Sequence, residues 1–553
     1  MRFVKLIAPL ICVLAWGSGD TPAPSPLEEP FFPKPGYFKK RFFTPEPRIA
    51  LAPPAHLGDF VHDGKLELSL KNYLDLVAAN NTDIAIQKVN LEFARDQVTR
   101  SLSLFDPFAS ATFNSTRTQS PSATVLSGAT TVNQLFQPLT MQVQQTVATG
   151  GQYTVGFDAS KTSTNSSFAT FNPQIDAGLN LAFTQPLLRG RGASIVKLPI
   201  LIATGRFQSA RFSLRDQVIQ LVDAAESAYW DVVAARDNLR VQREALKLAG
   251  AALDRAKKEV ELGATSPLEI FQPEANYAGA QVSVTQAKYQ LTEAEDALRK
   301  QIGADLDPQI RVLPLDLTET AALPSENPPI DAEAEVVKAL RLRPDLAATV
   351  QNLDVDEKGV KLARNGLLPN LSLGFQYGSS GLGGIFFPGV NILNGVPLPP
   401  VPGGAGEALS QLFQFSYPFY GFSLTLQLPI KDHNAAANLA DSLSQKKSDT
   451  LQRRTQEQTV RLQVLNAVHQ VENSLESARL AKVARDLAQK RVEADQKRYE
   501  LGATTLFFVL ASQNDFTVAE SNYVTQAINY RRNLLNLLRR TGELLDDRGI
   551  VVE

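Results

Sequence analysis

Side chains for catalysis and metal binding are scarce in this chain. Its 553 residues include one cysteine, Cys12, and four histidines. The histidines lie on distant predicted elements, without the helical spacing of a metal-binding pair. An enzyme site needs several suitable groups gathered together. The sequence therefore predicts no catalytic residue, no cofactor and no metal site, and a protein that is not an enzyme. The histidines are His56, His62, His433 and His469.

An excess of charge is also absent. The chain has 55 Lys and Arg against 57 Asp and Glu, a formal net charge of −2, and it is 44% hydrophobic. Nucleic-acid-binding proteins usually carry a basic excess, so no nucleic-acid partner is expected. The chain is also too apolar to be disordered throughout.

Long apolar runs are missing too. Arg2 and Lys5 precede an apolar run over residues 6–16 and then small residues, which is the layout of a secretory signal peptide over residues 1–19. That run is too short to span a membrane as a helix, and no later segment offers about 18 continuous apolar residues. Because Ile11 precedes Cys12, no lipid anchor is expected. Cleavage would leave a chain without cysteine.

Proline is concentrated in residues 20–65, which are predicted to form an extended arm. The arm contains an aromatic and basic stretch over residues 37–43. Two interpretations stay open for this stretch: docking onto a partner or membrane surface, and packing of the arm along its own protein.

The chain also contains an internal repeat. Residues 261–265 recur as residues 500–504, both reading Glu-Leu-Gly-Ala-Thr, and residues 81–84 resemble residues 343–346 at the start of a predicted helix. The predicted organisation is a first repeat over 66–303, a connector over 304–330, a second repeat over 331–545 and a tail over 546–553.

Each repeat is predicted to contain strands. Four segments alternate apolar and polar residues with period two: 153–159, 179–184, 371–377 and 422–428. The segments 160–173 and 378–417 are expected to be surface loops. Residues 139–160 contain the turn signal Thr149-Gly150-Gly151 and are predicted to be an additional hairpin in the first repeat.

Each repeat is also predicted to contain a very long helix. Residues 207–262 contain no proline and residues 430–501 contain neither proline nor glycine, so the helices would reach roughly 80–105 Å. Apolar residues recur every seven positions from Val218 to Val260, as in a coiled coil. Glycine in each Glu-Leu-Gly-Ala-Thr segment would end the helix, and residues 268–301 and 506–540 would return. Because so few strands cannot close a sheet, subunits must pool them around one axis.

These features resemble those of the TolC-like outer-membrane efflux proteins. The most specific residues are 498–502, Arg-Tyr-Glu-Leu-Gly, and 509–513, Val-Leu-Ala-Ser-Gln. The resemblance implies an α+β membrane protein built from an internal duplication. In it, a homotrimer forms one β-barrel in the outer membrane of a Gram-negative bacterium, and an α-helical coiled-coil barrel continues into the periplasm.

The resemblance also implies the function of a passive export duct in a tripartite efflux or type I secretion system. Its partners would be a periplasmic adaptor (membrane fusion protein), an inner-membrane pump of RND or ABC type, and outer-membrane lipid. Drugs, metal ions and proteins all remain open as cargo. A periplasmic coiled-coil scaffold or adaptor is the alternative, although it leaves the strands and the duplication unexplained.

By resemblance, functional residues lie at the helical tips. The adaptor would contact Gly263, Ala264, Thr265, Gly502, Ala503 and Thr504. A latch would involve Glu269 and Tyr499, and a constriction Phe507 and Phe508. Phe508 and Ala511 stand where some members carry aspartates, so an apolar ring is expected. Two simpler roles are as open as the latch: Glu269 as an acid in the first turn of a helix, and Tyr499 as a residue that packs at the tip. The usual trimer of this family has four strands per subunit. The additional hairpin over residues 139–160 would therefore either widen the barrel or lie outside it.

Overall fold

The computed structural model describes residues 55–122, 127–263, 265–320, 323, 329–389, 396 and 398–551. The predicted signal peptide and most of the proline-rich arm lie outside the described residues, as does Ala264. The described part belongs to one compact unit, Pro53–Glu553. Within it, no helix combines the length and hydropathy that a membrane span requires.

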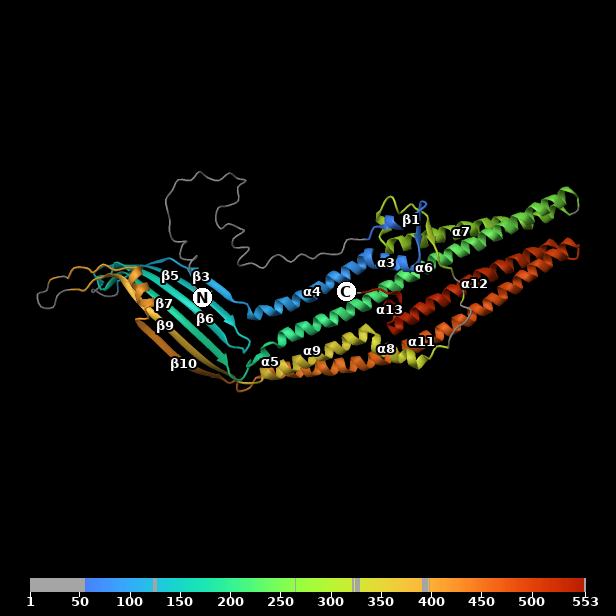
Figure 1. The fold of residues 1–553 in the computed structure, drawn as a ribbon. Coiled ribbons are helices and arrows are strands. Elements are labelled where there is room, and N and C mark those ends of the chain that lie inside the picture. Colours follow the sequence, from blue (N-terminus) through green and yellow to red (C-terminus); the bar gives the residue numbers. More distant parts are fainter. Residues whose placement is uncertain are drawn as a thin grey trace, which may run out of the picture. The chain divides into compact units, whose positions relative to one another are not determined.

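The two halves of the described chain repeat one order of elements (Figure 1). A short helix and a medium helix lead into strands, and the strands lead into a long helix and its returning partner. The first set is α3 Leu70–Asn80, α4 Thr82–Leu102, α6 Leu198–Glu261 and α7 Phe271–Gln301, and the second is α8 Ala332–Leu342, α9 Pro344–Gly366, α11 His433–Glu500 and α12 Leu506–Thr541. The predicted duplication and coiled-coil hairpins are therefore confirmed.

The medium helices begin at the same place in each half but by different chemistry. The Asn81 side chain accepts hydrogen bonds from the backbone N–H groups of Asp83 and Ile84, so it caps α4. In the second half Pro344 occupies the first turn of α9, where its missing N–H is harmless. The helix start is thus preserved although the capping residue differs.

Helix α6 carries most of the predicted seven-residue seam. It has 64 residues and α11 has 68, which corresponds to about 96 and 102 Å. The seam residues Val218, Ala225, Val232, Leu239 and Leu253 are buried, and Leu246 and Val260 are half-buried. This burial confirms the coiled-coil prediction for the first hairpin, because a seven-residue repeat keeps one apolar stripe facing its neighbours.

Helices α6 and α12 join the two hairpins through ion pairs. Asp223 pairs with Arg539 at 2.8 Å, and Arg240 pairs with Glu520 at 3.4 Å. Beside them, Arg548 on α13 (Leu544–Arg548) reaches Glu226, which is 1% exposed, at 2.7 and 2.9 Å. Hydrogen bonds to a buried carboxylate are strong, so these contacts hold the hairpins side by side.

One antiparallel sheet contains nearly all the strands. Its order is β10-β9-β7-β6-β5-β3, and β4 also pairs with β5. The bounds are β3 Phe108–Phe113, β4 Thr116–Pro121, β5 Thr131–Thr146, β6 Gln152–Thr164, β7 Phe171–Pro186, β9 Asn370–Phe386 and β10 Tyr417–Gln427. Strand β3 pairs with residues 139–144 of β5, and β4 pairs with residues 131–136 of the same strand. The two short strands therefore lie end to end and share one strand position in the sheet. The described residues therefore supply six strand positions in this sheet.

The four strands predicted from period-two alternation are confirmed, but the two loop predictions were partly wrong. Strand β6 continues to Thr164 and β7 begins at Phe171, inside the segment predicted as the first loop. Strand β9 continues to Phe386, and α10 (Ala405–Phe413) forms inside the second. Glycine and serine at 378–384 interrupt the apolar pattern, so the sequence signal ends before the strand does.

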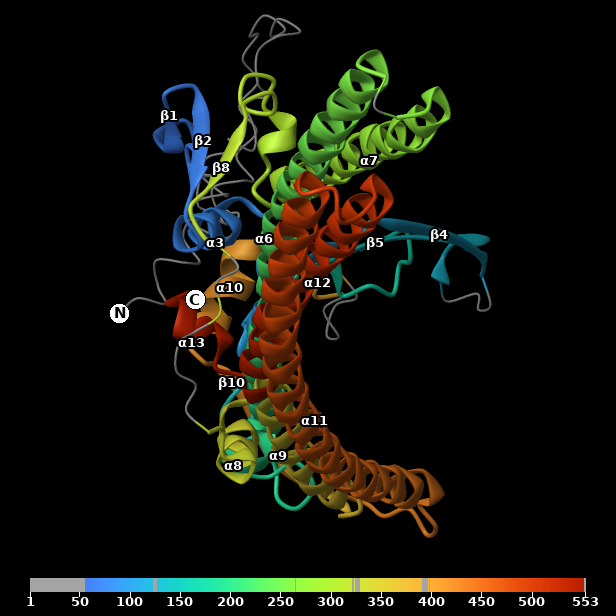
Figure 2. The ribbon, with the colours of Figure 1, turned by 90° about the vertical axis from the view of Figure 1, so that its right-hand side faces the viewer.

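A small sheet that joins the start of the described chain to the connector between the repeats was not predicted. It joins β1 Val61–His62, β2 Lys65–Leu68 and β8 Leu315–Leu317, with β2 parallel to β8. Leu66 and Leu68 are fully buried, and such a side chain contributes about 1.5–3 kcal/mol. Figure 2 shows this sheet, α3, α8 and α13 on one side of the long helices. The segments are too short to show a period, so only their pairing reveals them.

Candidate functional site

Both hairpins turn at a glycine in the left-handed region. Gly263 has φ +68° and Gly502 has φ +73°, and both Cβ positions face open space. The Gly502 N–H donates to the Tyr499 carbonyl at 3.0 Å, and the Ala503 N–H donates to the Arg498 carbonyl at 2.8 Å. This pair of bonds is the Schellman helix end, which requires positive φ. Backbone conformation rather than crowding therefore selects glycine at both tips.

Tyr499 connects the two hairpins just below their tips. Its hydroxyl donates a 2.6 Å hydrogen bond to Glu259 Oε2 on α6. Arg255 Nε lies 3.1 Å from Glu259 Oε1, and the Arg255 guanidinium stacks 4.6 Å from the centre of the Tyr499 ring. The three side chains form one connected contact between α6 and α11, which we call the tip contact.

The surroundings of Tyr499 favour its neutral phenol. Partial burial raises its pKa to about 12, and the hydrogen bond to the Glu259 carboxylate and the negative charge of that carboxylate act in the same direction. A neutral phenol is the form that donates the hydrogen bond. Tyr499 therefore keeps the proton that it donates in this hydrogen bond throughout the neutral pH range.

Glu269, the second residue predicted for the latch, lies at the tip but outside the tip contact. It sits in the short 3-10 helix Pro267–Ile270, and its side chain is exposed. Among the described residues no ion pair to Glu269 is found, although its charge contributes to raising the pKa of Tyr499. The sequence interpretation missed Glu259. The repeat itself was the usable signal, because aligned repeats place the ends of α6 and α11 at the same level.

The remaining predicted tip residues are mostly exposed. Phe507 and Phe508 are 62% and 52% exposed, and their rings meet edge to face with centroids 5.6 Å apart. Ala503 is exposed, and Thr265 and Thr504 are half-buried. Exposed neighbouring phenylalanines are unusual on a helix that faces water alone, so this surface is suited to contact with another chain.

The large sheet has one apolar and one polar face. The register aligns Val143, Val155, Leu181, Tyr377 and Tyr420 in one row across five strands. The next row on the other face is Gln144, Thr154, Ala182, Gln376 and Gly421. The apolar side remains uncovered over much of its area, with Tyr420 and Phe422 82% and 78% exposed. A membrane barrel has this arrangement, with the apolar face toward lipid and the polar face toward water.

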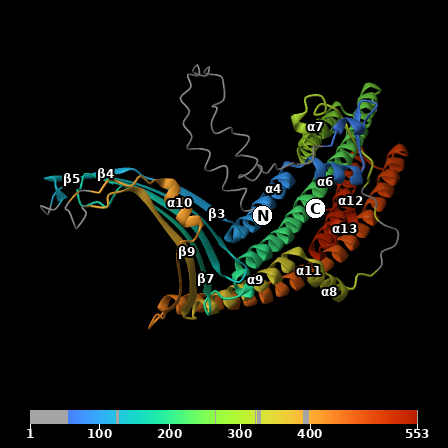
Figure 3. The same cartoon turned by 60° about the vertical axis from the view of Figure 1, so that its left-hand side comes forward.

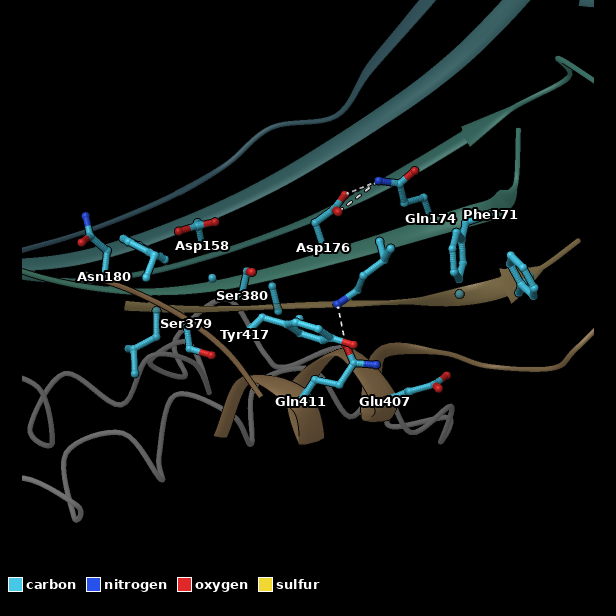
Figure 4. A pocket seen from close by; sticks show the side chains of 18 of the residues that line it. Asp158, Phe171, Gln174, Asp176, Asn180, Ser379, Ser380, Glu407, Gln411 and Tyr417 are labelled. Atoms are coloured by element: carbon cyan, nitrogen blue, oxygen red, sulfur yellow. Dashed lines mark hydrogen bonds between the residues drawn. The ribbon is translucent and has the colours of Figure 1, made fainter. Parts of the chain in front are cut away.

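Helix α10 covers part of the apolar face at the end of the sheet away from the long helices (Figure 3). Its Ala408 and Leu412 pack on Ala177, and a Cβ at Gly381 would meet the Ala408 carbonyl at 2.0 Å. Gln411 accepts a hydrogen bond from the Leu382 backbone N–H at 3.0 Å (Figure 4). A cavity of about 880 Å³ lies here, lined in part by Asp158, Asp176 and Glu407.

The described residues contain no group of three or more His, Cys, Asp or Glu side chains that could hold a metal ion. Their functional features are instead the two-faced sheet, the long hairpins and the tip turns. Fold and site together define a channel-forming outer-membrane protein with coiled-coil hairpins. The sequence profile of the "Outer membrane efflux protein" family matches residues 73–304 and 336–543, so the chain belongs to that family.

Individual relatives agree with this assignment. The chain is 25% identical over 414 residues to the pyoverdine export outer membrane protein OpmQ of Pseudomonas aeruginosa, covering 73% of this chain and 75% of that protein. It is 27% identical over 208 residues to the outer membrane protein TolC of Vibrio cholerae, covering 37% of this chain and 45% of the relative. The latter match thus spans less than half of that relative.

Solved structures share the fold. The outer membrane channel CmeC of Campylobacter jejuni superposes with a TM-score of 0.59 at 15% identity, covering 88% of this chain and 87% of that one. The open-state channel MtrE of Neisseria gonorrhoeae gives 0.58 at 16% identity, covering 86% and 89%. The predicted α+β channel fold and the outer-membrane assignment are confirmed.

Proposed function

We propose that three copies of this chain form a passive export duct across the outer membrane and periplasm. The observation that carries this proposal is the large sheet, which has one apolar face and two free edges, β10 and β3/β4. Free edges are not tolerated in lipid, and one chain cannot close them. Pairing β10 of each copy with β3/β4 of the next would close a ring.

The duct would work with a periplasmic adaptor and an inner-membrane pump of RND or ABC type. The adaptor would grip the two tips around residues 263–265 and 502–504, where the backbone turns are exposed and shaped by glycine. The duct itself would provide no energy. The pump and the adaptor would select the cargo, so the same duct would serve efflux of drugs or metal ions and secretion of proteins.

The tip contact would hold the inner end closed until the adaptor engages. It ties α11 to α6 through Tyr499, Glu259 and Arg255. Glu269 would contribute through its charge near Tyr499, and Phe507 and Phe508 would narrow the aperture. Replacing Glu269 with Ala should loosen the closed tip and raise conductance in planar bilayers, and unchanged conductance would remove Glu269 from the latch.

Extraction tests the proposal directly. The protein should appear only in outer-membrane fractions, require detergent, scatter light as a trimer and shift to a monomer band on a gel after boiling. A water-soluble monomer or dimer would mean that the apolar face meets a protein core. That result would favour the periplasmic scaffold instead.

A further inference from the structure

We infer that the hairpin β5–β6 is part of the barrel wall, so that the trimer closes an eighteen-stranded barrel instead of one with four strands per subunit. Six strand positions in each of three chains give this number. The inference rests on the proposed trimeric duct and specifies its width. A wider duct admits bulkier cargo.

The hairpin is paired over its full length. Strand β6 pairs with β5 from Gln134↔Thr164 to Thr146↔Gln152, and with β7 from Gln152↔Thr184 to Thr162↔Gln174, in both cases without a register shift. Strand β5 in turn pairs with β3 and β4. A hairpin lying outside the barrel would leave β3 to pair with β7, whereas here two strands separate them.

The hairpin also has the same two faces as the rest of the wall. Val143 and Val155 continue the apolar row of Leu181, while Gln144 and Thr154 lie on the polar face. A slip of one residue would reverse these faces. Because the rows at 143 and 144 agree with those of β7 and β9, this half of the hairpin meets the same two environments. One side would face lipid and the other water.

The turn of the hairpin is tied to the end of β7 and to the loop that follows it. The Gly192 N–H donates to the Thr149 carbonyl at 2.9 Å, and the Thr149 hydroxyl lies 3.0 Å from Gln185 Oε1. Gly150 has φ +90°, and a Cβ there would meet the Gly190 carbonyl at 2.4 Å. The turn is therefore fixed at the junction between β7 and the helices.

Strand number sets the width. With strands about 4.8 Å apart and tilted about 40°, eighteen strands give a backbone radius of about 18 Å and twelve give about 12 Å. Subtracting about 5 Å for side chains, half the spacing of packed sheets, leaves lumens of about 26 and 14 Å.

A lumen of about 26 Å would pass a helical hairpin, whose two helices are each about 10–12 Å wide.

Cysteine labelling tests the inference, with Cys12 replaced by serine. Thr154→Cys places a thiol on the polar face of β6, and the matched control Thr184→Cys places one on the polar face of β7. Purified trimers in vesicles receive thiol-reactive polymers of graded diameter. We expect both cysteines to show the same size limit and to react with polymers about 20 Å across, which a lumen of about 14 Å excludes.

Two outcomes would overturn the inference while leaving the trimeric duct intact. One is a limit near 14 Å at Thr184→Cys with no limit at Thr154→Cys, because the hairpin would then lie outside the barrel. The other is a strand count of twelve in an electron cryo-microscopy map of the unmodified trimer. Failure to isolate a trimer in light scattering would instead refute the proposed function.

Discussion

Removing one hydroxyl at the tip contact tests the proposed role of that contact in closure. Tyr499→Phe keeps the ring that stacks on Arg255 and deletes the 2.6 Å hydrogen bond to Glu259. Hydrogen bonds to charged groups contribute about 1.5–3 kcal/mol. The expected loss lies below this range, because Tyr499 is only half-buried and Glu259 keeps its ion pair with Arg255.

We therefore expect a loss of about 1 kcal/mol per chain. If the three tips open together, the trimer loses about 3 kcal/mol, which shifts the ratio of closed to open channels roughly a hundredfold. Single-channel recording in planar bilayers without adaptor should show a matching rise in open probability.

The matched control is Tyr289→Phe, which removes a hydroxyl from a tyrosine on α7 that is 71% exposed. It should leave the recordings unchanged.

Raising the pH gives a second readout. Because the folded pKa of Tyr499 is raised to about 12, the stabilisation is fully present below about pH 10 and is lost as the pH rises toward 12. An unchanged open probability in Tyr499→Phe would refute the assignment of the tip contact to closure.

Three further changes probe other parts of the chain. Gly502→Val forces a β-branched residue to φ +73° and should weaken adaptor affinity; unaltered affinity in a pull-down would count against a tight turn. Arg548→Met leaves the buried Glu226 carboxylate without its cationic partner and should destabilise the fold by about 3–5 kcal/mol, read from the melting temperature. Burial and the neighbouring Asp449 raise the pKa of Asp356 to about 6. The stabilisation from this group is thus present below about pH 4 and is lost as the pH rises through 6. In Asp356→Asn the melting temperature should therefore change less between pH 4 and 7 than in the unchanged protein.

Local patterns predicted most of the helical part. The seven-residue seam from Val218 to Leu253 marks one face of α6, and the glycines at 263 and 502 mark where each long helix ends. These signals are short-range, because a helix repeats every 3.6 residues and ends where a left-handed residue is tolerated. The helical hairpins could therefore be drawn from the sequence.

The tip contact was only partly predictable. Tyr499 and Glu269 were both selected by their position beside the tips, and their role in closure stays a prediction. The structure adds Glu259 at hydrogen-bonding distance from Tyr499. The contact joins residues of two different hairpins, so no pattern within one helix could identify it.

What the sequence by itself determined was the class of elements: two repeats, amphipathic strands, long coiled-coil helices and glycine turns. The tertiary structure decided which strands are neighbours. It placed β5 and β6 between β3 and β7 and extended β9 to Phe386, where glycine and serine had hidden the alternation. The physical reason is that period-two alternation records which face a residue occupies. Strand order and strand number depend on hydrogen bonds between distant segments.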